Sequence, residues 1–137
     1  MIKEIIKDKE ILSLKGEVAT KDDLEICKDL LDTLEARKEE CVGLAANMIG
    51  YAKRIICVNV ENKNIVMINP VIVKTSKTGY EAEEGCLSHD ETHTVKRFYS
   101  IRVEYYDMDF NKRVKTFSDF DAEVIQHEMD HLEGILI

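Results

Sequence analysis

The feature that most constrains this chain is the hexapeptide at residues 126–131, which contains the pattern His-Glu-x-x-His. On a helix, His127 and His131 lie about one turn apart on the same face, so both imidazoles can bind one metal ion. Glu128 lies beside the first histidine, where it can act as general base on a water held by that metal. Two histidines on a half-buried structural helix would give the same pattern, so its surroundings have to decide.

The residues around this pattern favour a helix. Ser118 can cap its N-terminus, Asp119 supplies negative charge to the first turn, and Gly134 can end it. Apolar residues recur at helical spacing, namely Phe120, Ala122, Ile125, Met129 and Leu132. We therefore predict a C-terminal amphipathic helix that presents both histidines on one face.

The third metal ligand is expected upstream of this helix. A hydrolytic metal site needs three protein ligands and an open position. One zinc-protease pattern would place the third ligand at Ile137, which cannot bind a metal, and no residue follows it in the sequence. Cys86, within the stretch Glu-Gly-Cys-Leu-Ser at residues 84–88, is the best candidate because a thiolate binds zinc or ferrous iron well.

Two further histidines lie close to this cysteine. Cys86, His89 and His93 could bind a metal without the helix, but this would leave the His-Glu-x-x-His pattern unexplained. We therefore predict that His89 and His93 are loop residues near the mouth of the site.

Length and composition limit the remaining function classes. A chain of 137 residues is expected to form a single domain, 1–137, with a substantial core. A net charge of -8 argues against a nucleic-acid-binding surface. The four cysteines form no Cys-x-x-Cys pair and no secretory leader is recognisable, so we expect a reduced, cytoplasmic setting. No apolar run is long enough to span a membrane.

The rest of the chain has an α+β pattern. A helix is predicted after Thr20, with an apolar stripe made by Leu24, Cys27, Leu31 and Leu34. Strands are predicted at residues 55–60, 65–68, 71–73, 98–106 and 114–117. We expect antiparallel strands and hairpins packed around the C-terminal helix, with one N-terminal helix.

Three motifs in this chain resemble those of the peptide deformylase family. Two are intact, namely Glu-Gly-Cys-Leu-Ser at 84–88 and Gln-His-Glu-x-Asp-His-Leu-x-Gly at 126–134. Residues 41–50 are similar to the family motif Gly-x-Gly-Leu-Ala-Ala-x-Gln-x-Gly, but Cys41 replaces its first glycine and Met48 replaces its glutamine. The motifs occur in family order and near family spacing.

The resemblance implies a function and a set of site residues. Members of the family remove the N-formyl group from N-formylmethionyl peptides of nascent proteins. Cys86, His127 and His131 would bind the metal, with ferrous iron expected and zinc or nickel as substitutes. Glu128 would be the catalytic acid and base, and the backbone N–H of Leu87 would donate to the formyl oxygen. Ribosome docking has no support in the sequence.

Four further residues are predicted to contact substrate by the same resemblance: Gly43, Leu44, Met48 and Arg97. Arg97 and Glu84 also match family positions that form an ion pair supporting the site. Met48 is the departure that matters chemically, because a thioether cannot donate the hydrogen bond that the family's glutamine gives to the developing oxyanion. Losing one such donor costs about two to three orders of magnitude in rate.

Two other functions stay open on sequence grounds. The chain could be a deformylase-like metalloprotein that acts on another formamide or amide, or that binds formylated ends without turnover. It could also be a structural metal domain, in which a fourth protein ligand such as His89 or His93 closes the metal.

Overall fold

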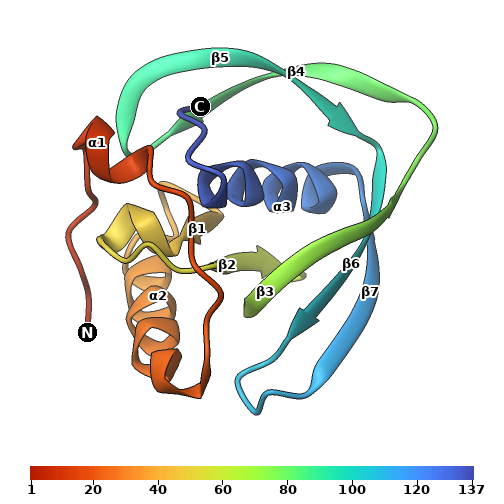
Figure 1. The fold of residues 1–137 in the computed structure, drawn as a ribbon. Coiled ribbons are helices and arrows are strands. Elements are labelled where there is room, and N and C mark those ends of the chain that lie inside the picture. The colour runs from red at the N-terminus through yellow and green to blue at the C-terminus, as the bar shows by residue number, and fades with distance from the viewer.

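The computed structural model describes residues 1–137 as a five-stranded antiparallel sheet, a two-stranded hairpin and three α-helices (Figure 1). The five strands lie in the order β1-β2-β3-β6-β7, and β4 pairs with β5. The helices are α1 (Lys9–Leu12), α2 (Leu24–Ala36) and α3 (Asp119–Leu132), with short 3-10 turns η1 (Lys21–Asp23) and η2 (Ala46–Ile49). The strands are β1 (Gly43–Ala45), β2 (Ile55–Val60), β3 (Lys63–Thr75), β4 (Gly79–Cys86), β5 (His89–Phe98), β6 (Ser100–Tyr106) and β7 (Lys112–Ser118).

Strand β2 lies at the centre of the core. Residues 55–58 are all fully buried, although alternate side chains of a strand point to opposite faces. Helices α2 and α3 both contact β2, so both faces of this strand are covered. In Figure 1 the β4–β5 hairpin arches over α3, and α3 contacts β5 as well as β2. The helix that carries the two histidines is therefore held between the hairpin and the sheet.

The N-terminal helix is confirmed and begins as the sequence indicates. The Thr20 hydroxyl accepts from the backbone N–H of Asp22 at 3.2 Å, and Asp23 accepts from the backbone N–H of Thr20 at 2.9 Å. This reciprocal cap closes the 3-10 turn η1, from which α2 continues. The inner face of α2 buries Ile26, Cys27, Leu30 and Leu34 against the sheet.

The first 18 residues form an N-terminal arm that precedes η1 and α2. Apart from the single turn α1 and an isolated bridge between Glu17 and Lys53, the arm has no regular secondary structure. Its backbone is tied to the rest by hydrogen bonds from Ile6 N to Met48 O at 2.8 Å and from Gly16 N to Leu132 O at 2.8 Å. The arm therefore contacts both the motif at residues 41–50 and the end of α3.

Two strand predictions need correction. The predicted strands at 65–68 and 71–73 are one strand, β3, which continues past Pro70 with shifts of register on either side of Val71 and Ile72. Strand β5 was not predicted, because the two-stranded hairpin leaves most of its side chains exposed and its sequence lacks the alternation that marks a half-buried strand.

The C-terminal helix starts and ends where predicted. Ser118 occupies the N-cap position, although its side chain makes no capping hydrogen bond. Gly134 follows the helix with a φ of 76°, a conformation that favours glycine. The predicted α+β class with antiparallel strands is confirmed. None of the helices combines the length and the apolar character needed to cross a membrane.

Candidate metal and catalytic centre

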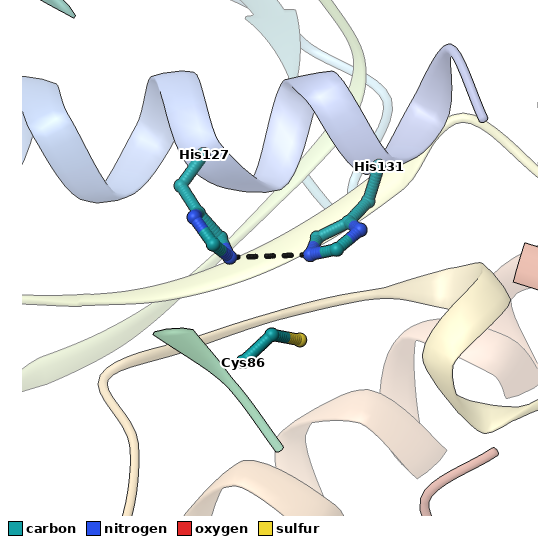
Figure 2. Close-up of side chains that lie close together, drawn as sticks. All are labelled: Cys86, His127 and His131. Carbon is teal, nitrogen blue, oxygen red and sulfur yellow. Dashed lines mark hydrogen bonds between the residues drawn. The ribbon is translucent and has the colours of Figure 1, made fainter. Parts of the chain in front are cut away.

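Three metal-ligating side chains converge between β4 and α3. Cys86 is the last residue of β4, and His127 and His131 lie one turn apart on α3. Their ligand atoms all lie within 4.8 Å of one another. Figure 2 shows both imidazoles pointing from α3 toward the end of β4, with the two Nε2 atoms 3.1 Å apart. The structure thus brings together the three residues that the sequence predicted as ligands.

The geometry and chemistry of this group fit a divalent metal ion. Two nitrogens bound tetrahedrally to zinc at about 2.0–2.1 Å would lie roughly 3.3 Å apart, close to the separation of the two imidazoles. A thiolate with two imidazoles suits zinc, iron or nickel. The group contains three protein ligands and no fourth, which is the number found at catalytic rather than structural metal sites.

A buried ion-pair network fixes the first histidine. His127 Nδ1 lies 2.7 Å from Glu84 Oε1, so a proton on Nδ1 is held there and Nε2 is left for a metal. Arg97 donates two hydrogen bonds to Glu84, from Nη2 at 2.7 Å and from Nε at 3.0 Å. Its third nitrogen, Nη1, lies 2.7 Å from Asp130 Oδ2. Both Glu84 and Arg97 are buried, so this network is shielded from solvent.

The pKa values in the network follow from burial and from these contacts. Burial alone would raise the pKa of Glu84, but hydrogen bonds from His127 and Arg97 outweigh it and lower this pKa to about 2. Burial and the charge of His127 lower the pKa of His131 to about 3, which keeps the imidazole neutral, the form that binds metal.

Glu128 has the properties of a proton carrier. It is 4% exposed, and its Oε1 atom has no hydrogen-bond partner. Burial raises the pKa of Glu128 to about 7; His127 opposes this rise and Glu84 adds to it. A carboxyl group with a pKa near neutrality can both take up and release a proton at physiological pH.

A cavity of about 330 Å³ opens beside these residues. Its wall includes two of the ligands, Cys86 and His127, together with Glu128. The rest of the wall comes from the motif around η2, from β4 and its turn and from the start of α3: Glu40, Cys41, Val42, Gly43, Met48, Glu83, Glu84, Gly85, Leu87, Phe120, Glu123 and Val124. Its volume is within the range of small-molecule sites.

Three of the predicted substrate and oxyanion residues line this cavity: Gly43, Met48 and Leu87. A Cβ atom at Gly43 would lie 2.9 Å from Glu128 Oε2, so only glycine lets β1 approach the carboxylate this closely. Met48 is 1% exposed, and its sulfur accepts from the backbone N–H of Ala45 at 3.4 Å. The buried thioether therefore adds no hydrogen-bond donor to the cavity wall.

Two other predicted contacts lie away from the cavity wall. Leu44 is fully buried in the core. The guanidinium group of Arg97 is occupied by Glu84 and Asp130, which agrees with the supporting ion pair inferred for it. Direct substrate contact by Leu44 or Arg97 stays a prediction.

The loop histidines do not join the ligand group. His89 Nε2 contacts the backbone oxygen of Ile137, and His93 lies 3.8 Å from Glu91. Both residues belong to β5 rather than to a loop, so their predicted placement needs correction. The alternative metal site built from Cys86, His89 and His93 is not formed.

Sequence reasoning missed two residues that support the centre. Asp130 completes the ion-pair network on Arg97, although it lies inside the motif that was recognised. Asn47 donates from Nδ2 to the backbone oxygen of His131 at 2.8 Å. Its position beside Met48 was the only signal available, since a polar residue in a motif of small and apolar residues needs a partner when buried.

Comparison with known proteins identifies the family. The profile described as polypeptide deformylase matches residues 2–137. The chain belongs to the polypeptide deformylase family. It is 53% identical over 137 residues to the peptide deformylase of Clostridium beijerinckii, with 100% of each chain covered. A peptide deformylase is a hydrolase that removes the N-formyl group from nascent peptides, so the predicted enzyme class is confirmed.

Solved structures agree with this family assignment. The crystal structure of a class I type b peptide deformylase from Acinetobacter baumannii with Met-Ala-Ser bound has a TM-score of 0.88 and 29% identity, covering 99% of this chain and 97% of that chain. The enzyme from Thermotoga maritima has a TM-score of 0.89 and 29% identity, covering 99% and 95%. The deformylase fold is thus retained along almost the whole chain.

Proposed function

We propose that this deformylase acts on N-formylmethionyl peptides, with Glu128 and the backbone N–H of Leu87 as its catalytic groups. The observation that carries the proposal is the unpartnered Oε1 of Glu128, buried in the cavity wall beside the three metal ligands. A buried carboxylate oxygen without a partner is unfavourable unless a bound group uses it. A water molecule that attacks the formyl carbon is such a group.

The proposed reaction uses this chain's residues in two proton steps. A divalent ion bound by Cys86, His127 and His131 would lower the pKa of a water and polarise the formyl carbonyl. Glu128 takes a proton from the attacking water, and Leu87 N–H donates to the carbonyl oxygen as that oxygen gains charge. Glu128 then gives its proton to the leaving amine, so that formate and a free N-terminus result.

The cavity supports a peptide substrate with a methionine side chain. Its wall mixes apolar groups, including Val42, Leu87 and Val124, with the polar centre. The Acinetobacter baumannii relative has been crystallised with Met-Ala-Ser, a peptide that starts with methionine. We propose ferrous iron as the native ion and the cytoplasm as the location, where the four free cysteines would stay reduced.

The first test is Glu128→Gln, assayed anaerobically with iron on a formyl-Met peptide. We expect turnover to fall by about two to four orders of magnitude while metal content stays at the wild-type level, because the amide cannot carry the proton. Glu123→Gln is the matched control, since Glu123 lines the same cavity from the same helix but bonds Tyr80 instead. Equal rates in Glu128→Gln and wild type would contradict the role of this residue.

The second test concerns Met48, which we propose lowers the rate by removing an oxyanion donor. Met48→Gln should raise kcat/KM by about two orders of magnitude, the usual contribution of one such donor. Met48→Leu keeps an apolar side chain of similar volume and should leave the rate unchanged. If Met48→Gln has no effect in metal-loaded protein, the account of position 48 is wrong.

Met48 also favours one other function. A site without the side-chain amide donor at position 48 could hydrolyse a different formamide or amide, or hold a formylated end without turnover. A panel of formyl-peptides and small formamides at matched metal content separates these functions. Faster turnover of a compound other than formyl-Met peptides would replace the proposed substrate.

A further inference from the structure

One metal ligand, His131, lies in the last turn of its helix, where a helix is least stable. Helix α3 ends at Leu132, so His131 is its penultimate residue. The last carbonyl groups of a helix have no partner within it, and helix ends open at little cost in free energy. In this helix the backbone N–H of Gly134 donates to His131 O at 3.0 Å and that of Ile135 to Asp130 O at 3.1 Å, and contacts from other segments add to these local bonds.

Two hydrogen bonds from distant segments hold the last turn of α3. The backbone N–H of Gly16, in the N-terminal arm, donates to Leu132 O at 2.8 Å. The side-chain amide of Asn47, in η2, donates to His131 O at 2.8 Å. Of these two bonds, only the second ends on the residue that supplies a metal ligand.

The amide of Asn47 is committed to donation. Asn47 is 3% exposed, and its Nδ2 also lies 3.3 Å from the backbone oxygen of Leu12. Its Oδ1 atom is buried without a partner, so both hydrogen bonds of the side chain come from the NH₂ group. Asn47 therefore joins α1, η2 and α3 at a single side chain.

We propose that Asn47 is a positioning residue for the metal, because its amide fixes the backbone of His131 and hence the imidazole in the ligand group. The proposal rests on the metal centre of the proposed function but not on the substrate. A positioning role differs from simple packing, because loss of a packing residue would lower only the stability of the fold. A positioning role also sets the affinity for the ion.

The test is metal affinity, measured apart from turnover. Asn47→Ala and Asn47→Asp are stripped with a chelator, then titrated with Zn²⁺ against a coloured competing chelator and with Co²⁺ by visible absorption. We expect affinity to fall about 10–100-fold, the usual effect of losing a group that orients a metal ligand. The Co²⁺ spectrum should change as well. In Asn47→Asp the carboxylate cannot donate and would face two carbonyl oxygens, so metal affinity should fall at least as much as in Asn47→Ala.

Asn69→Ala is the matched control. Asn69 also bridges backbone, accepting from Ala19 N at 2.8 Å and donating to Ala19 O at 2.9 Å, and its side chain forms no hydrogen bond with α3 or η2. Its loss should lower thermal stability and leave affinity and the Co²⁺ spectrum unchanged. Asn47→Ser serves if Asn47→Ala does not fold.

Wild-type affinity and spectrum in the folded Asn47 variants would overturn the proposal, whatever their stability. The result is independent of the substrate proposal. A protein whose metal affinity depends on Asn47 but which leaves formyl-Met peptides intact would refute only the proposed function.

Discussion

Replacing Glu84 by glutamine tests whether the buried network supports the metal centre. The carboxylate accepts from His127 Nδ1 and from two nitrogens of Arg97, at 2.7, 2.7 and 3.0 Å. The glutamine oxygen can still accept from His127, but its NH₂ group would face a donor nitrogen of Arg97. The variant keeps the shape of the side chain and removes its charge and one hydrogen bond.

The expected cost follows from these contacts. Breaking a buried ion pair by removing one partner costs about 3–5 kcal/mol. Asp130 still accepts from Arg97 at 2.7 Å, which places the loss near the lower end of that range, at about 3 kcal/mol. For a domain of this size 1 kcal/mol corresponds to about 3–4 °C, so Tm should fall by roughly 10 °C. Metal affinity should fall about 10–100-fold, because the Glu84 carboxylate that orients His127 loses its negative charge.

The assay is urea denaturation with chelator present, followed by competitive Zn²⁺ titration of the folded variant. Glu83→Gln removes the same charge from the preceding residue of β4, which is exposed, lines the same cavity and forms no ion pair. It should behave as wild type. If Glu84→Gln matched Glu83→Gln in both stability and affinity, the network could not be what holds His127.

Two further predictions concern the approach to the centre and the core. Gly43→Ala should lower turnover about a hundredfold with metal content unchanged. The added Cβ would lie 2.9 Å from Glu128 Oε2 and 2.9 Å from Val124 Cγ1. Wild-type kinetics in this variant would show that β1 moves away freely. Leu30→Ala changes a fully buried position on α2. It should lower the free energy of unfolding, measured by urea denaturation, by about 2–5 kcal/mol and leave metal affinity unchanged. A parallel loss of affinity would show that α2 packing and the metal centre are coupled.

The sequence was most informative where chemistry depends on local spacing. The helical period alone places His127, Glu128 and His131 on adjoining positions of one face, so the histidine pair and the base were predictable before any fold was known. The start of α2 was also predictable, because the Thr20 cap involves residues only three apart. The assignment of Cys86 as third ligand needed the family motif as well, since nothing local links it to the helix.

The tertiary structure decided what depends on distant pairing. Cys86 meets the histidines because the β4–β5 hairpin arches over α3 (Figure 1). Strand β5 lacked a sequence pattern because one of its faces is exposed and the other, which includes His93, Val95 and Arg97, is mostly polar. Asp130 and Asn47 acquire their roles only through Arg97 and the backbone of His131. Local periodicity depends only on residues that are neighbours in the sequence, so it can be recognised without knowing the fold. The partner of a buried polar group depends on how the helices and strands pack, and the spacing of residues along the chain does not reveal it.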